Sequence, residues 1–255
     1  MFSLKDKVAL ITGSTRGIGK SIAEEMARAG AKVAISSRKL DACREVADAI
    51  NASHADSAIA VAASISSREA LQELVDATRR QWGRIDILVC NAASNPYYGP
   101  MGGISDDQFR KILDNNVLSN NWLIHMVAPE MLARGEGSII IVSSIGGMTS
   151  STVIGAYNIS KAADFQLARN LAAEFGPKGV RVNCIAPGLV RTDFARALWE
   201  NPETLRAVTA HTPLRRIGEP REIAGAAVFL AAPASAFVTG QAIVVDGGST
   251  IGVGL

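Results

Sequence analysis

The sequence has few cysteines and no marked excess of either charge. Its 255 residues include three cysteines, Cys43, Cys90 and Cys184, which lie far apart and lack paired spacing. Neither a disulfide framework nor a thiolate metal site is therefore expected. Lys and Arg total 26 against 24 Asp and Glu, a net charge of +2. This balance disfavours a surface built to neutralise nucleic-acid phosphates, so no nucleic-acid partner is expected.

Long apolar runs are also missing. No stretch approaches the roughly 18 apolar residues of a membrane-spanning helix, and charges stand where a signal peptide would be apolar. The last residues, Val253-Gly254-Leu255, do not match a peroxisomal address. His54, His125 and His211 show no metal-ligand spacing. We therefore expect a cytoplasmic protein that needs neither a membrane nor a metal.

What the chain does contain is a repeated succession of short apolar runs and longer helical segments. Seven runs rich in valine and isoleucine indicate strands buried on both faces, at 8–12, 33–37, 59–63, 85–91, 138–143, 180–185 and 242–245. Helices are expected between them, at 20–29, 40–50, 68–81, 106–131, 157–175 and 220–231. Helix stops are expected at Gly30, Gly83 and Gly176.

This alternation predicts an α/β fold with a single domain over residues 1–255. The expected architecture is a Rossmann-type doubly wound parallel sheet of about seven strands, with helices on both faces. Residues 191–218 interrupt the alternation and contain Pro202 and Pro213. Because this insertion follows a strand end, where ligands bind in such sheets, it is a candidate substrate lid.

A glycine-rich turn joins the first expected strand to the first expected helix. It reads Thr12-Gly13-Ser14-Thr15-Arg16-Gly17-Ile18-Gly19. Glycines let the backbone approach a ligand closely, and the free N–H groups of a helix start attract a pyrophosphate. In the first crossover of such a sheet the turn favours a dinucleotide site. The alternative is that the glycines serve only close helix packing.

The end of the second strand indicates which dinucleotide binds. NAD sites usually place a carboxylate there for the ribose 2′-hydroxyl, whereas a basic residue accommodates the 2′-phosphate of NADP. Here the strand ends Ser36-Ser37-Arg38-Lys39, and Arg16 in the glycine turn offers a second guanidinium. We therefore expect NADP(H). NAD(H) is the alternative if Arg38 and Lys39 only cap the next helix.

Tyr157 and Lys161 are four residues apart near the start of an expected helix, so they share one face. A phenol has a pKa near 10, and lowering it to about 7 takes roughly 4 kcal/mol. An ammonium about 4 Å away supplies that at an effective dielectric of about 20, but only about 1 kcal/mol in water. The pair therefore predicts a partly dry site.

Ser144, after the fifth strand, would donate to a substrate carbonyl, and Ser143 is its rival.

Together these residues resemble the classical short-chain dehydrogenase/reductase family, over essentially the whole chain. The family pattern is a Thr-Gly-x-x-x-Gly-x-Gly loop, an Asn-Ala-Gly turn after strand four, a catalytic Asn, a Ser thirteen residues before Tyr-x-x-x-Lys, and Pro-Gly after strand six. The interval from 144 to 157 is thirteen and selects Ser144 over Ser143. Asn116 matches the catalytic Asn, and residues 187–192 match the nicotinamide loop.

The resemblance implies hydride transfer between a nicotinamide and a carbonyl or alcohol carbon. Tyr157 would be the acid in reduction and the base in oxidation, and Lys161 would lower its pKa and hold the nicotinamide ribose. Ser144 would orient the carbonyl, and Asn116 would fix a water that extends the proton path. The cofactor set implied by the turns and strand ends is Gly13, Thr15, Arg16, Ile18, Gly19, Ser37, Arg38, Ser64, Ile65, Asn91, Ala92, Tyr157, Lys161, Pro187, Gly188, Val190 and Thr192.

The chain departs from the family pattern at two turns. Ala93 follows Asn91-Ala92 where the family usually has glycine, and Ser64-Ile65 replaces the Asp-hydrophobe pair that commonly holds adenine. Segments 36–39, 91–100 and 181–199 are similar to NADP-dependent carbonyl reductases that act on ketones, aldehydes and retinoid-like substrates. The resemblance also implies a homotetramer, with dimer faces on the helices at 106–131 and 157–175.

Aromatic and methionine side chains near the expected substrate mouth would make it apolar, although packing or subunit contact also explains them: Tyr97, Tyr98, Met101, Met148, Phe194, Leu198 and Trp199. We therefore expect a small-molecule ketone, aldehyde or alcohol as substrate. A 3-oxoacyl thioester reductase is the first rival, and Arg134 and Arg215-Arg216 would meet its acidic carrier protein. An NAD-dependent alcohol dehydrogenase and a non-enzymatic cofactor-binding regulator are the others. The intact Asn-Ser-Tyr-Lys set disfavours the regulator.

Overall fold

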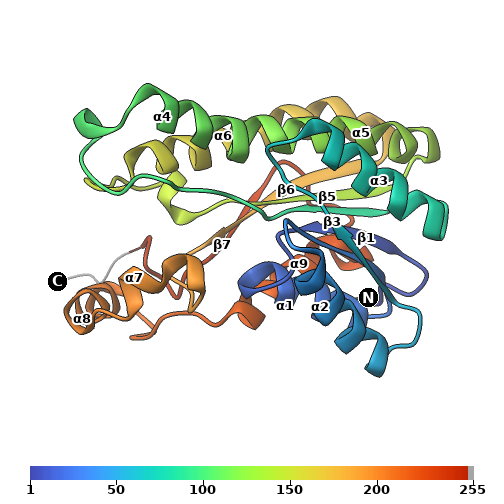
Figure 1. The fold of residues 1–255 in the computed structure, drawn as a ribbon, viewed down its shortest axis with the longest axis horizontal. Helices are drawn as coiled ribbons and strands as arrows, with labels where there is room; N and C mark the ends of the chain where they lie inside the picture. The colour runs from blue at the N-terminus through green and yellow to red at the C-terminus, as the bar shows by residue number, and fades with distance from the viewer. Residues whose placement is uncertain (252–255) are drawn as a thin grey trace.

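Seven parallel strands form one sheet in the order β3-β2-β1-β4-β5-β6-β7 (Figure 1). The structure is a computed structural model that describes residues 1–251, so the C-terminal tripeptide considered above lies outside the described residues. The strands are β1 Val8–Thr12, β2 Lys32–Ser37, β3 Ala58–Ala62, β4 Ile87–Cys90, β5 Gly137–Val142, β6 Val180–Pro187 and β7 Ala242–Val245.

The central strands are mostly apolar because helices cover both faces of the sheet. Every residue of β1, β4 and β5 is buried. On one face lie α1 Gly17–Arg28, α2 Leu40–Ser53 and α9 Pro220–Ala231 (Figure 1). On the other lie α3 Arg68–Trp82, α5 Ser119–Arg134 and α6 Gly155–Phe175. The expected doubly wound parallel sheet is confirmed. No helix within residues 1–251 is both long and apolar enough to cross a membrane.

Helix ends follow local backbone chemistry. Gly83 ends α3 in the left-handed region, with φ at 76°. α6 ends at Phe175 with Gly176 as its C-cap, so the stop expected at Gly176 is confirmed for the α-helix, although Gly176 keeps a helical φ of −53° and begins a 3-10 turn. The fixed φ of Pro177 suits a helical turn, so the chain continues as a 3-10 turn. The left-handed conformation that ends this turn is adopted by Gly179.

The segment expected to be helical over 106–131 is helical, but it is not one regular α-helix. α4 Asp106–Leu113 leads into a π-helical turn, Asp114–Leu118, and α5 then runs on to Arg134. A π-turn carries one residue more than an α-turn, so the flanking helices are out of phase. The buried pair Asn115 and Asn116 lies in this turn, and such turns are frequent at functional sites.

Residues 191–218 form a separate group of short elements. They contain a 3-10 turn, Asp193–Ala195, and two short helices, α7 Arg196–Trp199 and α8 Pro202–His211. Pro202 begins α8 rather than interrupting a helix, and Asn201 caps it by accepting from the backbone N–H groups of the first turn. Figure 1 shows α7 and α8 beyond the end of β7, away from the helices that cover the sheet.

The point at which the crossovers change direction lies between β1 and β4. β1 pairs with β2 on one side and with β4 on the other. In an open α/β sheet, ligands bind at the carboxyl ends of the strands beside such a point. The glycine turn after β1, the Asn91 turn after β4 and the serines after β5 all leave the sheet at this edge.

Candidate active site

The glycine turn after β1 forms a cradle in which the glycine positions have little room for a side chain. Gly13 and Gly17 adopt left-handed φ angles of 65° and 54°. A Cβ on Gly19 would collide with the Gly13 carbonyl and the Asn91 side-chain amide. In the described chain α1 has no side-chain cap, and its first turn holds no acidic residue. Its first N–H groups and positive dipole end are therefore available to an anion, as a dinucleotide pyrophosphate requires.

Asn91 and Ala92, which follow β4, hold this cradle in place. The Asn91 side chain donates to the carbonyls of Thr12 at 2.9 Å and Gly13 at 3.2 Å. The backbone N–H groups of Asn91 and Ala92 donate to the Thr12 hydroxyl at 3.0 and 3.1 Å. The two turns predicted to line the cofactor groove are therefore bound to each other.

The rest of the predicted cofactor set lies along the same edge of the sheet. Ser37 ends β2, Pro187 ends β6 and Ser64 follows β3. The methyl group of Thr192 lies 3.2 Å from the position that a Cβ on Gly17 would take, so residue 192 covers the glycine cradle. The remaining members stand in these turns or at the start of α1: Thr15, Arg16, Ile18, Arg38, Ile65, Gly188 and Val190.

The two arginines expected to meet a 2′-phosphate differ in their surroundings. Arg38 is exposed and forms no ion pair with any of residues 1–251. Arg16 lies 3.6 Å from the carboxylate of Asp193, which belongs to the 191–218 segment. Exposed pairs of this kind contribute little free energy, about 0 to 1 kcal/mol. As far as the described residues go, a phosphate at this edge could therefore meet the unpaired guanidinium of Arg38 and the weakly held guanidinium of Arg16.

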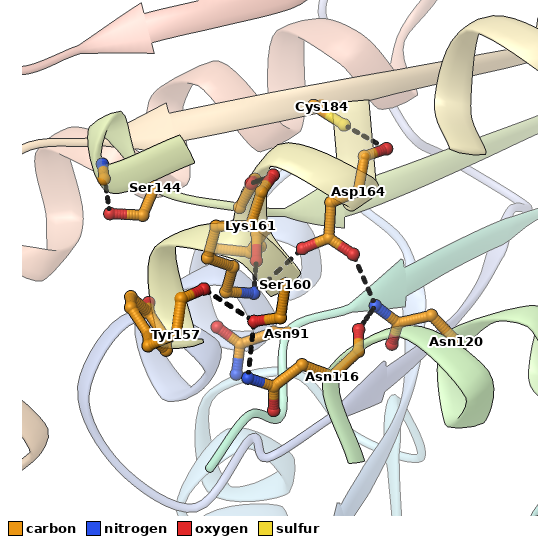
Figure 2. Close-up of polar contacts among 12 residues, drawn as sticks. Asn91, Asn116, Asn120, Ser144, Tyr157, Ser160, Lys161, Asp164 and Cys184 are labelled. Atoms are coloured by element: carbon orange, nitrogen blue, oxygen red, sulfur yellow. Dashed lines mark hydrogen bonds and ion pairs between the residues drawn. The ribbon is translucent and has the colours of Figure 1, made fainter. Parts of the chain in front are cut away.

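Tyr157 and Lys161 lie one turn apart on α6, and Lys161 is inside the protein (Figure 2). The Lys161 side chain is 2% exposed, and its Nζ lies 5.7 Å from the centroid of the Tyr157 ring. Nζ donates to the Val142 carbonyl at 2.9 Å and to the Asp164 carboxylate at 3.0 Å. The ammonium is thus held in a dry position beside the phenol.

The pKa of Tyr157 does not fall toward 7, the value that acid–base chemistry at neutral pH would favour. Burial raises the pKa of the phenol, the charge of Lys161 lowers it, and Asp164 raises it again. A hydrogen bond with Ser144 lowers it by less than these effects. The balance leaves the pKa of Tyr157 above its ordinary value, so the hydroxyl is protonated and can act as a donor at neutral pH.

The two serines after β5 have different partners. Ser143 is buried, and its hydroxyl donates to the Lys161 carbonyl at 2.8 Å. Ser144 accepts from the Gly146 backbone N–H at 3.0 Å (Figure 2) and is the serine whose hydrogen bond acts on Tyr157. The geometry thus gives a physical reason for preferring Ser144, because the hydroxyl of Ser143 is already used inside the fold.

Asn116 is fully buried in the π-helical turn, and its side-chain amide is satisfied (Figure 2). Nδ2 donates to the Ser94 carbonyl and to the Ser160 hydroxyl, both at 3.0 Å, and Oδ1 accepts from the Ser94 N–H at 2.8 Å. Asn115 donates to the Ser94 hydroxyl at 2.9 Å. The turn after β4, which lacks the family's glycine, is therefore held by two adjacent asparagines.

Three polar residues of this network escaped the sequence prediction: Asn120, Ser160 and Asp164. Asp164 accepts from Lys161 and, at 3.2 Å, from Asn120, which also donates to the Asn116 carbonyl at 2.6 Å. The available signal was spacing, because Asp164 is three residues after Lys161 and Asn120 is four after Asn116. Such intervals place both pairs on one helix face.

Exposed apolar side chains lie around Tyr157 and on nearby turns. The ring of Phe194 lies 5.9 Å from that of Tyr157. Tyr98, Met101 and Met148 are also exposed. Tyr97 differs, since its hydroxyl donates to the Pro100 carbonyl at 2.8 Å and so holds its own loop.

The basic residues considered for an acidic carrier protein lie in different places. Arg134 donates to the carbonyl of Ile85, before β4 and so at the opposite edge of the sheet. The other two line a cavity of about 780 Å³ beside α8, together with Arg191, Arg206 and Arg221. Arg191 and Arg216 are paired there with Glu219 and Glu222. These arginines do not form one basic face with Arg134.

The chain is similar to known proteins over nearly its full length. A family model described as Enoyl-(Acyl carrier protein) reductase matches residues 13–250. Dehydrogenase/reductase SDR family member 4 of Bos taurus is 41% identical over 249 residues, covering 96% of this chain and 88% of the relative.

Two solved structures show the same likeness in three dimensions. One is a 7α-hydroxysteroid dehydrogenase complexed with NADH and 7-oxo glycochenodeoxycholic acid, with a TM-score of 0.91, 38% identity and coverage of 97% of this chain and 95% of that one. The other is a gluconate 5-dehydrogenase from Burkholderia cenocepacia J2315 in complex with NADP and tartrate, with a TM-score of 0.94, 32% identity and coverage of 99% and 98%.

Identity at this level over almost the whole chain extends the likeness beyond the fold to the family's chemistry. The protein is an oxidoreductase that uses a nicotinamide cofactor on CH–OH or C=O groups of small molecules. The chain belongs to the short-chain dehydrogenase/reductase family.

Proposed function

We propose that the protein is an NADP(H)-dependent carbonyl reductase of apolar ketones or aldehydes, and the dehydrogenase of the matching secondary alcohols in reverse. One observation carries the proposal: the Nζ of the buried Lys161 lies 5.7 Å from the ring centroid of the half-buried Tyr157, whose hydroxyl is protonated at neutral pH. Both side chains stand at the sheet edge that carries the glycine cradle.

Four side chains share the proposed proton transfer. Tyr157 donates a proton to the carbonyl oxygen in reduction and accepts one from the alcohol in oxidation. Ser144 donates a hydrogen bond to the same oxygen and stabilises the charge that develops there. Lys161 would stabilise the phenolate and hold the nicotinamide ribose, and Asn116 would fix a water that extends the proton path. The chemistry that a nicotinamide would supply here, when bound, is the transfer of a hydride.

The residues of the glycine cradle and of the strand ends would hold the dinucleotide. The α1 N-terminus would bind the pyrophosphate, residues 190–192 would hold the carboxamide, and Ser64 and Ile65 would line the adenine site. Of the two solved neighbours described above, one carries NADH and the other NADP, so both cofactors occur among similar proteins. The free guanidinium of Arg38 supports NADP for this chain.

Arg38→Glu is expected to weaken NADPH binding by about 10- to 100-fold and NADH binding by much less, because a carboxylate would repel the 2′-phosphate. Fluorescence titration with both nucleotides measures the difference. Arg44→Glu, which makes the same charge change on an exposed residue of α2, is the control. Equal losses of NADPH and NADH affinity in the Arg38 variant would contradict the assignment.

An apolar substrate is supported by the exposed side chains Tyr98, Met101, Met148 and Phe194. Because Phe194 lies on Tyr157 and belongs to residues 191–218, we propose that this segment is the substrate lid. The lid would cover the apolar group of a ketone next to the proton donor and exclude water from it.

A substrate panel followed by NADPH and NADH absorbance tests the proposed function. It contains apolar ketones and aldehydes, secondary alcohols, sugar acids and a carrier-bound 3-oxoacyl thioester. Turnover of apolar carbonyls with NADPH supports the proposal. Turnover of the thioester alone would favour the thioester reductase, which the position of Arg134 disfavours. Tight cofactor binding with no turnover of any compound would favour the non-enzymatic cofactor-binding regulator.

We also infer a homotetramer, in line with the family. Leu118, in the π-helical turn, and Ile159, on α6, are exposed apolar residues in the two segments expected to form dimer faces. Val244, on the edge strand β7, is exposed as well. Sedimentation equilibrium should give a mass near four times 26.8 kDa, and a monomer would contradict the inference. The cytoplasmic location stays a prediction.

A further inference from the structure

Asp164 is a buried carboxylate directly against the lysine of the active site (Figure 2). Its side chain is 0% exposed, and Oδ2 lies 3.0 Å from Nζ of Lys161. Within the described residues Nζ has one further acceptor, the Val142 carbonyl at 2.9 Å. Among residues 1–251, the only negative charge bonded to this ammonium is therefore that of Asp164.

An ammonium in this position needs a counter-ion to stay charged. The pKa of a fully buried lysine without one falls by as much as about 3 to 5 pH units, so the amine loses its proton. Burial lowers the pKa of Lys161, but the charge and hydrogen bond of Asp164, together with the smaller effects of Tyr157 and Cys184, leave that pKa above its ordinary value. Burial raises the pKa of Asp164 in turn, and the ammonium of Lys161 opposes this rise. Without Asp164, a neutral carbonyl would be the remaining acceptor.

We propose that Asp164 is a positioning residue that keeps Lys161 in its ammonium form and fixes Nζ beside Tyr157. The proposal rests on the proposed function in one respect, because it takes Lys161 to stabilise the phenolate of Tyr157. A counter-ion at this position therefore controls the proton donor without touching the substrate.

The same carboxylate fixes the position of the lysine relative to the π-helical turn. Oδ1 accepts from Asn120, and the Asn120 amide also donates to the Asn116 carbonyl. The main-chain carbonyl of Asp164 accepts from the thiol of Cys184 on β6 at 3.4 Å. Asp164 thus joins α6, α5 and the sheet around the ammonium (Figure 2).

Few other groups near the pair change charge. Tyr157 comes from α6, Cys184 from β6 and Cys90 from β4. Burial raises the pKa of both thiols, so they are neutral throughout an ordinary assay range. The π-turn and α5 contribute the uncharged amides of Asn116 and Asn120, and β5 contributes the Val142 carbonyl. A change in pH dependence after substitution of Asp164 therefore reports on Lys161 and Tyr157.

Asp164→Asn, which removes the charge and keeps the size, should move the pH profile of alcohol oxidation to higher pH. The charge of Lys161 stabilises the phenolate and lowers the pKa of Tyr157. Loss of the Lys161 charge raises the pKa of Tyr157 by more than removal of the Asp164 charge lowers it, because the effect of Lys161 is the larger of the two. The rise in oxidation rate with pH therefore moves by about 1 to 3 pH units in the alkaline direction. Oxidation at a fixed pH below this rise then slows by about 10- to 1,000-fold.

Asp86→Asn is the matched control. Asp86 is also buried, and it is paired with Arg84 and Arg134 before β4, at the far edge of the sheet. Its substitution breaks a buried ion pair without affecting Lys161, so the pH profile should stay in place. An equal alkaline shift in both variants, no shift in the Asp164 variant, or an acid shift in it would each overturn the proposal.

The charge of Lys161 can also be read without turnover. Within residues 1–251 it is the only buried lysine, so its 13Cε signal should stand apart in a lysine-labelled sample. We expect an ammonium throughout about pH 6 to 9 in the unaltered protein and a titration inside that range in Asp164→Asn. Asp164→Ser, smaller and also neutral, serves if the amide variant does not fold.

This reading separates failure of the proposal from failure of the proposed function. A neutral Lys161 in the unaltered protein, or an ammonium unchanged in the Asp164 variants, would overturn the proposed role of Asp164. Neither result depends on whether Tyr157 is the acid. An active Tyr157→Phe variant would instead overturn the function and leave the charge measurement intact.

Discussion

Tyr157→Phe is expected to lower kcat for carbonyl reduction by about 10²- to 10⁴-fold, the usual contribution of a positioned proton donor. The substitution removes one hydroxyl and keeps the ring that packs near Phe194, so the fold should not change. The glycine cradle and Arg38 lie in other turns, so NADPH affinity should change by less than about tenfold, or about 1.4 kcal/mol. Steady-state assays and a fluorescence titration measure the two quantities.

Tyr97→Phe is the control for this prediction. It makes the same chemical change at a hydroxyl that donates to the Pro100 carbonyl in its own loop. Loss of such a bond costs about 0.5 to 1.5 kcal/mol of stability. Because the Tyr97 hydroxyl takes no part in the proposed proton transfer, kcat should stay close to its original value. Comparable turnover by Tyr157→Phe and the unaltered protein would refute the proposed acid.

Breaking the Lys161–Asp164 pair from either side is expected to lower the free energy of unfolding by about 3 to 5 kcal/mol. Lys161→Met leaves a buried carboxylate without its partner, and Asp164→Leu leaves a buried ammonium without its counter-ion. The double variant removes both charges and fills the space with apolar groups, so most of the lost stability should return. Urea denaturation at one protein concentration, followed by circular dichroism, measures all four proteins.

The outcome of this cycle also shows why the pair is present. A double variant that is stable but inactive would mean that the two charges serve chemistry rather than folding. Losses that simply add in the double variant would contradict the prediction, because they would show that each side chain stabilises the fold independently of the other.

The sheet, the glycine turn after β1 and the Asn91 turn after β4 could be predicted from the sequence because their signals are local. Strands buried on both faces appear as continuous apolar runs, and β1 and β7 have the expected bounds. The glycines of the first turn are required by left-handed φ angles and by the close approach of Asn91, which no other residue type allows. The choice of Ser144 over Ser143 rested on spacing, and the partner of Ser143 now explains it.

The rest of the site depends on tertiary contacts that a pattern does not contain. The π-turn at Asp114–Leu118 interrupts a segment that is helical on both sides, so periodicity predicts a single helix. Asp164 stands at the right interval to meet Lys161, but only burial of both makes the pair important. The pKa of Tyr157 follows from burial and from the opposing charges of Lys161 and Asp164. The sequence pattern identified Lys161 but did not identify Asp164.

The π-helical turn at Asp114–Leu118 sets the orientation of the residues on its two sides relative to each other. Without the surplus residue, α4 and α5 would join as one regular coil, and residues on either side would rotate by about 100° relative to each other. Asn116 would then turn away from Ser94 and Ser160, while the coil would still cover the sheet. The one additional residue of the π-turn therefore lets the segment place Asn116 in the site while its helices still pack on the sheet.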